Sequence, residues 1–318
     1  MEYRTLGRTG LNVSLLGMGT GGWNCLGQRH DPPVPEPDIH RLLHGVFDLG
    51  INLFDTAPGY LESEAILGRA LRSLPRDQVV VSTKVSLVEG DDQPTAVTEE
   101  EIMSSVEQSL QRLQLSEIHV LLIAVPDASF YDDVFDDQME VIQRLQDQGK
   151  VRFIGSSERT RSDGSHDWLL RALPTDLLNV AMVGHNMINQ SAQKSVFPLC
   201  LERDIGTMNI FTVRNVFRDT TRLTEVVAEL KSQGHLTDDV DEQGPFDWLL
   251  DDPNVESLVE AAYRYAAYTP GVTSVMCGTI TPEKVEQNIA SLEKGPLNPS
   301  HISRLEKTFG HISEAIGN

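Results

Sequence analysis

The chain has 318 residues, of which 40% are hydrophobic and 23% are charged, so it is too apolar for a disordered protein and can form a large core. Lysine and arginine number 26 against 47 acidic residues, a formal net charge of -21, which excludes nucleic acid and anionic membranes as expected partners because phosphate groups repel such a chain. The three cysteines lie far apart, no stretch approaches 18 apolar residues, and no basic region with an apolar run opens the chain. We therefore expect a cytoplasmic protein without disulfide bonds.

Short β-rich runs alternate with amphipathic stretches from about residue 13 to residue 292, which is typical of βα units around a parallel sheet. We expect strands at Leu15–Gly17, Ile51–Ala57, Val79–Val85, Val120–Ala124, Val151–Ser156, Asn179–Val183, Thr207–Val213 and Val272–Cys277. The sequence therefore predicts an α/β fold with one domain over residues 1–318. In it, an N-terminal β-hairpin precedes a (β/α)8 TIM barrel, and an extra helix near Ser300–Phe309 follows the barrel.

The stretches between the strands carry apolar residues at helical spacing, for example Ile39, Leu42, Leu43 and Val46, and then Ile102, Val106, Leu110 and Leu113. Thr98 and Glu101 have the spacing of a capping box, and Gly50 and Gly149 stand where helices end in a left-handed residue. The connection from 214 to about 254 is unusually long. We interpret it as a substrate-side loop with short helices, and we rank a mobile linker between domains as the second interpretation.

Two charged residues end neighbouring apolar strands. Asp55 in INLFDTAPGY would be costly to bury without a cation or a donor nearby, and Lys84 in VVVSTKV presents the converse problem on the next strand. Because adjacent parallel strands place their ends side by side, an ion pair between Asp55 and Lys84 satisfies both. A purely structural salt bridge and a catalytic pair are equally compatible with these two residues alone.

Tyr60 favours the catalytic interpretation. It follows Asp55 by five residues and lies beyond Pro58 and Gly59, in the loop above the same strand ends. A phenol has an ordinary pKa of about 10, and a neighbouring ammonium stabilises its phenolate and lowers that value. Tyr60 can then donate a proton to a carbonyl oxygen as hydride arrives. The alternative is that the ring of Tyr60 only packs in the loop.

Several segments together resemble the aldo-keto reductase superfamily over nearly the full length: YRTLGRTGLNVSLLGMGT, GINLFDTAPGY, SEAILGRAL, VVVSTKV, GKVRFIG and PGVTSVMCGT with VEQN. The resemblance implies an oxidoreductase that interconverts a small carbonyl and an alcohol with NADP(H), NAD being the second possibility. It also implies a catalytic tetrad of Asp, Tyr, Lys and His, of which Asp55, Tyr60 and Lys84 match three members.

The fourth member of the tetrad is missing. The fourth strand of family members ends in a motif similar to LLLHxPD, but this chain reads LLIAVPD, with Ala124 where the histidine is expected. Alanine cannot hydrogen-bond a carbonyl, and the loss of one such donor lowers a rate by about 10² to 10³. His119 lies five residues upstream, so it should point to the opposite face of the strand and cannot substitute.

Other positions also depart from the pattern that the resemblance implies. The pair that resembles a carboxamide clamp is Ser157–Glu158 instead of Ser–Asn, and Met182 stands where glutamine is usual. Ile210 and Phe211 stand near the aromatic residue that stacks on nicotinamide in relatives. These departures make altered or weak activity a possible outcome.

The resemblance implies a cofactor site formed by Gly19, Thr20 and Asp55, by Ser157 and Met182, by Ile210, Phe211, Thr212 and Arg214, and by Gly278, Thr279, Thr281, Lys284 and Asn288. A helix that begins near Thr281 is suited to an anion. The basic residue expected near Ile280 for a 2′-phosphate is absent, and Lys284 or Arg214 would replace it. We expect Trp23 and Ala124 in the substrate pocket, and no metal site, because the nine histidines lack ligand spacing.

Two other functions remain open at this stage. The missing histidine is compatible with a barrel that binds the dinucleotide without catalysis and acts as a sensor or scaffold. Alternatively, Tyr60 and Lys84 perform non-redox acid/base chemistry on a sugar-like substrate.

Overall fold

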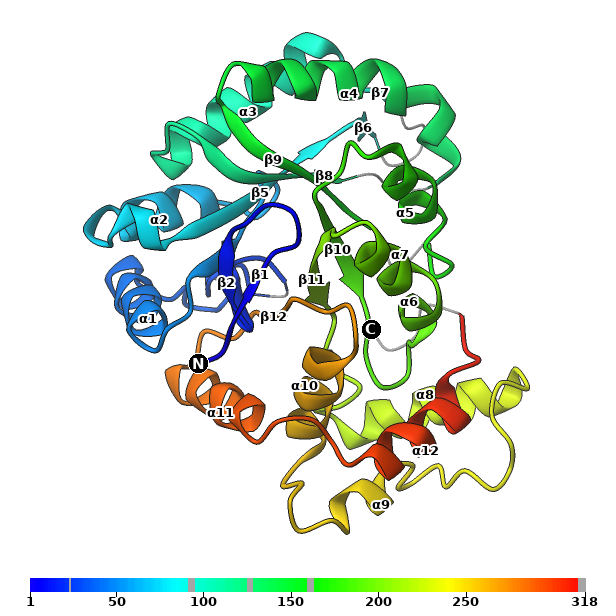
Figure 1. Ribbon diagram of the computed structural model, residues 1–318. Helices are drawn as coiled ribbons and strands as arrows, with labels where there is room; N and C mark the ends of the chain where they lie inside the picture. The colour runs from blue at the N-terminus through cyan, green and yellow to red at the C-terminus, as the bar shows by residue number, and fades with distance from the viewer. Residues whose placement is uncertain (23, 91–94, 125–127, 159–162, 314–318) are drawn as a thin grey trace.

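The computed structural model describes residues 1–22, 24–90, 95–124, 128–158 and 163–313, so Trp23 lies outside the described residues. Eight parallel strands close into a barrel in the order β10-β11-β12-β3-β4-β5-β8-β9 (Figure 1). The strands are β3 (Leu16–Gly19), β4 (Leu53–Asp55), β5 (Val80–Ser86), β8 (Ile118–Ala124), β9 (Val151–Ser157), β10 (Val180–Gly184), β11 (Gly206–Ile210) and β12 (Ser274–Cys277). Each overlaps one predicted run, so the predicted (β/α)8 barrel is confirmed.

Helices surround the barrel on its outer side (Figure 1). They are α1 (Glu36–Asp48), α2 (Ser63–Ala70), α3 (Glu99–Leu113), α4 (Tyr131–Asp147), α5 (Asp167–Ala172), α6 (Ser191–Lys194), α7 (Val196–Glu202), α10 (Leu258–Tyr268) and α11 (Pro282–Glu293). The predicted apolar faces of α1 and α3 are buried, and Thr98 and Glu101 form the predicted capping box. Gly50 and Gly149 have φ of 93° and 72°, as expected at helix ends.

The amino end of the barrel is closed by the predicted N-terminal hairpin, β1 (Tyr3–Thr5) and β2 (Asn12–Ser14). Leu6, Leu11 and Val13 of this segment belong to one apolar cluster with interior residues such as Val80 and Val180. The opposite, carboxyl end therefore remains as the mouth of the barrel, where sites in this architecture are found. A second small hairpin, β6 (Val88–Glu89) with β7 (Thr95–Ala96), is too short to be recognised in the sequence.

The long connection after β11 is a packed structure. It contains helices, as predicted, but only α9 (Asp247–Leu250) is short, whereas α8 (Thr220–Ser232) has 13 residues. The predicted extra helix α12 (Pro299–Phe309) follows later in the chain. Leu230, Phe246 and Phe309 join these elements in a second apolar cluster, separate from the main core. The connection is thus anchored by burial, which contradicts a mobile linker; its contact with a substrate stays a prediction.

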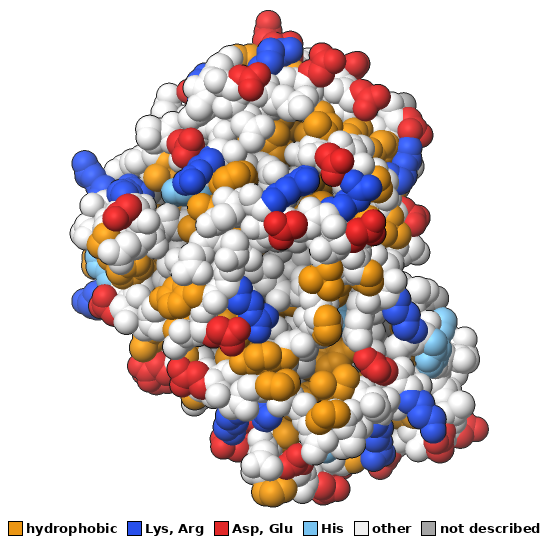
Figure 2. All heavy atoms as spheres, in the orientation of Figure 1, with side chains coloured by type: hydrophobic (Ala, Val, Ile, Leu, Met, Phe, Trp, Pro, Cys, Tyr) orange, Lys and Arg blue, Asp and Glu red, His pale blue; other side chains and the backbone are white. Residues whose placement is uncertain are grey.

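Many acidic residues are exposed to solvent, for example Asp132, Asp136 and Asp238. On the face shown in Figure 2, acidic side chains lie in many separate places with basic ones between them. Within the described part of the chain, no helix combines the length and the apolar character needed to span a membrane.

Candidate active site

The ion pair predicted between Asp55 and Lys84 is present at the mouth of the barrel. β4 ends at Asp55, and Lys84 projects from the neighbouring strand β5. The Nζ atom of Lys84 donates to both carboxylate oxygens of Asp55 at 2.8 Å and to the carbonyl oxygen of Thr56 at 2.9 Å. Ser82 Oγ donates a further hydrogen bond to Asp55 at 2.9 Å. Both charges are buried, so these bonds are what make their burial tolerable.

Tyr60 lies beside this pair. The Lys84 ammonium is 5.0 Å from the centre of the Tyr60 ring, and the ring is half-buried. The other side of the ring contacts Gly21, where a Cβ would stand 2.3 Å from Tyr60 Cε2. Glycine at position 21 therefore provides the space in which the ring lies. The sequence did not indicate this role, because the glycine-rich loop after the first strand offers several equivalent glycines.

The protonation of the site differs from the expectation. Burial raises the pKa of Tyr60, the Lys84 ammonium lowers it, and the Asp55 carboxylate raises it again, so that the net pKa lies above its ordinary value. The expected net lowering was wrong, because burial and Asp55 together more than offset the effect of the Lys84 charge. For Lys84, burial alone lowers the pKa, but Asp55 and Tyr60 outweigh it and the net pKa is raised. The site therefore contains a neutral phenol next to a charged ammonium.

Ala124 occupies the end of β8, directly between Ser86 of β5 and Ser157 of β9 in the strand register. Ser86 and Ser157 therefore flank the position of the missing imidazole in the strand register, and Ser86 Oγ also donates a hydrogen bond to the carbonyl oxygen of Val88. His119 lies near the amino end of β8, where its Nδ1 accepts a hydrogen bond from the Val81 N–H at 3.1 Å. Val120 and Leu122 of β8 belong to the cluster inside the barrel and Leu121 and Ile123 to the outer core, so His119 and Ala124 stand on opposite faces of the strand, as expected.

A buried chain of hydrogen bonds follows β9 at the position of the predicted carboxamide clamp. Glu158 accepts the Gly184 N–H at 2.7 Å, and its other oxygen lies 2.6 Å from His166 Nδ1. His166 Nε2 in turn lies 2.8 Å from Ser191 Oγ. Burial lowers the pKa of His166, but the Glu158 carboxylate more than compensates and the net pKa is raised. Glu158 and His166 therefore join the loop after β9 to the end of β10 and to the segment that follows it.

His166 and Ser191 were not identified from the sequence. A buried carboxylate demands a partner, but that requirement alone does not say which of nine histidines supplies it. Ser157, the other member of the predicted clamp, ends β9 and is buried. Met182 is also buried and belongs to the apolar cluster inside the barrel.

The predicted residues after β11 stay together at the mouth. Ile210 ends the strand and packs against the interior cluster, and Thr212 accepts a hydrogen bond from Asn209 Nδ2 at 2.9 Å. Phe211 and Arg214 both have positive φ, of 64° and 49°. This backbone places the Arg214 guanidinium 3.4 Å from the centre of the Phe211 ring.

The predicted phosphate turn lies between β12 and α11. Thr281 is the N-cap residue of α11, and Thr279 Oγ1 accepts its N–H at 3.3 Å. Lys284 is exposed on the first turn of α11, next to Glu283, whose charge opposes an anion there. Asn288 is buried, and its Nδ2 donates to Cys277 Sγ at 3.3 Å.

Unpaired polar atoms between β3 and β12 indicate that this part of the mouth fits a polar ligand. Thr20 is fully buried and its Oγ1 has no partner among the described residues; the same is true of Asn24 Oδ1. Asn24 Nδ2 reaches the Gly278 carbonyl at 3.5 Å, and a Cβ on Gly278 would stand 3.9 Å from the Gly19 carbonyl. Buried polar groups are rarely left unpaired, so these atoms fit the ribose and phosphate groups of a dinucleotide. The carboxamide end fits less well, because Met182 offers no amide.

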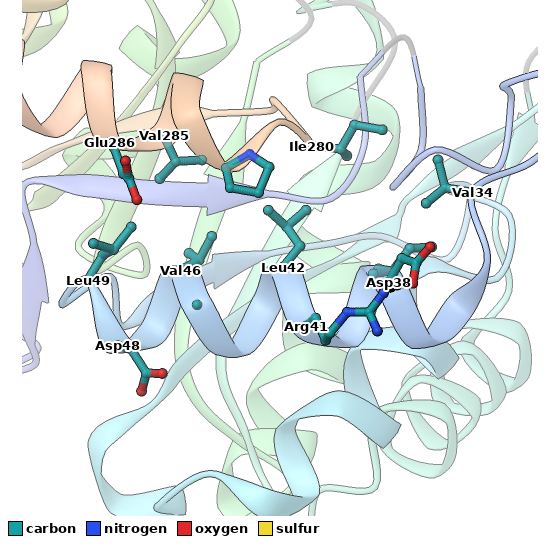
Figure 3. Close-up of a pocket in the computed structure, with 13 residues that line it drawn as sticks. Val34, Asp38, Arg41, Leu42, Val46, Asp48, Leu49, Ile280, Val285 and Glu286 are labelled. Carbon is teal, nitrogen blue, oxygen red and sulfur yellow. Dashed lines mark hydrogen bonds and ion pairs between the residues drawn. The ribbon is translucent and has the colours of Figure 1, made fainter.

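A groove of about 500 Å³ lies elsewhere, between α1 and α11 on the outside of the barrel (Figure 3). Leu42, Val46 and Val285 face one another across it in the close-up, with acidic groups such as Asp48 and Glu286 at its edges. None of the residues predicted to be catalytic lines this groove.

Comparison with known proteins decides the family. The sequence profile described as the Aldo/keto reductase family matches residues 16–309. The chain belongs to this family. Members of the aldo/keto reductase family are oxidoreductases that use NAD(P)H and act on small carbonyl compounds.

Relatives in the aldo/keto reductase family match nearly the whole chain. L-galactose dehydrogenase of Arabidopsis thaliana is 28% identical and covers 96% of this chain and 93% of its own. The NADH-specific methylglyoxal reductase of Escherichia coli is 26% identical, with coverage of 92% and 94%. A probable voltage-gated potassium channel subunit beta of Oryza sativa is 26% identical, with coverage of 96% and 96%.

The solved structures support the same fold. An aldo-keto reductase of Bacillus halodurans in its holo form superposes with a TM-score of 0.72 at 22% identity, covering 100% of this chain and 98% of the other. At this identity the likeness shows the barrel and its topology.

Proposed function

We propose that the protein transfers hydride between NADP(H) and a small carbonyl or alcohol substrate, with Tyr60 as the acid/base. The observation that carries the proposal is the position of Lys84. Its ammonium binds both oxygens of Asp55 at 2.8 Å and lies 5.0 Å from the Tyr60 ring centre. A structural salt bridge would not require a phenol at this distance on the solvent side of the pair.

Each of the three residues has a distinct role in this reaction. The bound nicotinamide cofactor supplies the hydride. Tyr60, which is a neutral phenol because its pKa is raised by burial, gives its proton to the carbonyl oxygen. The Lys84 ammonium stabilises the phenolate that remains, and Asp55 keeps Lys84 charged and in place. In the oxidative direction the same phenolate removes the proton of the alcohol.

The cofactor would be held by the residues around the unpaired polar atoms. Thr20 and Asn24 face this region from the loop after β3, and Gly278, Thr279 and Asn288 lie in the turn and helix after β12. We propose NADP over NAD on the two cations that could reach a 2′-phosphate, the exposed Lys284 and Arg214 on its Phe211 ring. One relative carries the name NADH-specific, so both cofactors belong in the test.

The substrate class follows from what stands around Ala124. The missing imidazole leaves no ring donor there, but the hydroxyls of Ser86 and Ser157 flank the position in the strand register. These groups suit a substrate that carries a hydroxyl next to its carbonyl, as in a small sugar, and they suit a simple aldehyde less. The relative named L-galactose dehydrogenase is consistent with this class.

The test is steady-state consumption of NADPH and of NADH over aldehydes, ketones and small sugars, with the reverse reaction on sugar alcohols and aldoses. Tyr60→Phe should lower kcat by at least about 10² because the proton donor is lost. Tyr3→Phe, which removes a phenol from the N-terminal hairpin, is the matched control and should leave kcat unchanged. Equal rates for Tyr60→Phe and the wild type would contradict the proposal.

A second function, a sensor or scaffold that binds the dinucleotide without turnover, is favoured by two observations. Ala124 and the engagement of Glu158 with His166 weaken the catalytic site, and one relative is named as a potassium channel subunit beta. Titration of NADPH fluorescence distinguishes the two functions. Binding with no turnover on any substrate of the panel supports the sensor, whereas binding with Tyr60-dependent turnover supports the oxidoreductase.

A further inference from the structure

Two arginines and a histidine gather at the amino end of the barrel, at the opposite end from the mouth. His119 and Arg152 are the second residues of β8 and β9, and the strand register on either side of them makes them neighbours. Arg76 begins the short 3-10 helix η2 (Arg76–Gln78) just before β5. Its Nη2 lies 3.5 Å from the carbonyl oxygen of Gln114, the C-cap residue of α3, four residues before β8 begins. Three segments therefore bring these side chains to one place.

None of the three has an acidic partner within the described part of the chain, although acidic residues outnumber basic ones by 47 to 26. Most other arginines are paired; Arg112 binds Glu64, and Arg203 binds Asp176. Arg76 Nη1 is buried without a hydrogen-bond partner among the described residues. A buried donor without an acceptor costs about 1–3 kcal/mol, so an acceptor is missing here.

His119 is a third donor that points to the same conclusion. Its Nδ1 accepts the Val81 N–H at 3.1 Å, which places the proton of the neutral ring on Nε2. Burial, Arg152 and Arg76 lower the pKa of His119 to about 4, so the ring is neutral at pH 7. The pKa of Arg76 is also lowered, mainly by burial and to a smaller extent by the charge of the neighbouring Arg72. Burial is the larger cause of both shifts, and the neighbouring guanidinium groups add to it.

We propose that Arg76, His119 and Arg152 form a binding site for a phosphate group, either inorganic phosphate or the phosphoester of a small metabolite. Guanidinium groups match the oxygen geometry of phosphate, and the imidazole Nε2–H supplies one more donor. A small dianion fits better than a polyanion because the net charge of -21 repels extended phosphate backbones. Asp77 and Glu117 lie next to Arg76 and close to His119 in the sequence, but within the described part of the chain no salt bridge joins either of them to these three side chains. This site is independent of the chemistry at the mouth.

The test is an NMR titration of the His119 ring in the full-length protein with inorganic phosphate, at constant ionic strength set by chloride. A bound anion should raise the pKa of His119 by at least about 1 unit, because it offsets the neighbouring guanidinium charges. Arg76→Gln and Arg152→Gln should each weaken phosphate binding by about tenfold or more. Arg41→Gln, on the exposed face of α1, is the matched control and should bind like the wild type.

The source of the phosphate is distinguished by a second arm with glycerol 3-phosphate. Tighter binding of this ester than of inorganic phosphate supports a metabolite, and equal binding supports free phosphate. No shift of the His119 resonances with either compound, or equal phosphate binding by the wild type and the Arg152→Gln variant, would overturn the proposal. Binding of an acidic peptide but of neither phosphate compound would also overturn it.

Discussion

Replacement of Lys84 by methionine tests how far the Asp55–Lys84 pair determines the folded site. The substitution keeps most of the side-chain volume but removes the ammonium that makes two hydrogen bonds of 2.8 Å to Asp55. The carboxylate, which is only 5% exposed, then keeps Ser82 as its side-chain donor. Breaking a buried pair on one side costs about 3–5 kcal/mol, so we expect a decrease of this size in the free energy of unfolding.

Asp55→Asn and the double variant complete the cycle. Each single variant leaves one buried charge or donor unpaired, but the double variant removes both charges. We therefore expect the double variant to lose less stability than the sum of the single variants, with a coupling of about 2 kcal/mol or more. Urea unfolding followed by circular dichroism measures all four proteins.

Lys150→Met provides the control, since Lys150 pairs with Glu107 at the surface and both side chains are partly exposed. A surface pair contributes about 0–1 kcal/mol, so this variant should change stability little. Additive losses in the Asp55–Lys84 cycle, or a loss below about 1 kcal/mol for Lys84→Met, would refute the reasoning.

Three further predictions concern the mouth of the barrel. Gly21→Ala should lower kcat by about tenfold or more, because the new Cβ would lie 2.3 Å from the Tyr60 ring and displace the ring. Gly45→Ala is the control and should keep full activity, because a Cβ there meets nothing within 4 Å. Ala124→His should raise kcat/KM for simple aldehydes by up to about 10²–10³ by restoring a donor, and an unchanged value would show that the position does not face the substrate. The pKa of His166 is raised in the folded state, so its contribution to the free energy of unfolding should be complete below pH about 6.5 and should decline as the pH rises through the folded-state pKa. The difference in free energy of unfolding between the wild type and His166→Gln, measured across a pH series, tests this. A difference that grows with pH would contradict it.

The elements of the barrel could be predicted because its strands are buried on both sides and read as apolar runs. The same parallel geometry predicted that Asp55 and Lys84 would meet, since the ends of neighbouring strands lie side by side. The capping box at Thr98 was equally local, with its two members three residues apart. Features that depend on residues close together in the chain, or on neighbouring strands, could therefore be predicted from the sequence.

Features that depend on several segments, or on the balance of several charges, could not be predicted from the sequence. The net pKa of Tyr60 is raised because burial and a carboxylate outweigh an ammonium, and the sequence gives no measure of their balance. The hydrogen-bonded chain from Glu158 through His166 to Ser191 joins the loop after β9 to the segment after β10, with a spacing that follows no motif. The cationic group of Arg76, His119 and Arg152 likewise appears only when three amino-terminal strand ends are brought together.

The central claim is that Tyr60 supplies the proton beside a bound nicotinamide. A single-turnover experiment tests it most directly: the protein is mixed with NADPH, a hydroxy-aldehyde is added, and the loss of the reduced nicotinamide absorbance is followed for the wild type and for Tyr60→Phe. The two proteins should bind NADPH equally, and the rate for Tyr60→Phe should be lower by at least about 10². Equal binding together with equal single-turnover rates would contradict the claim.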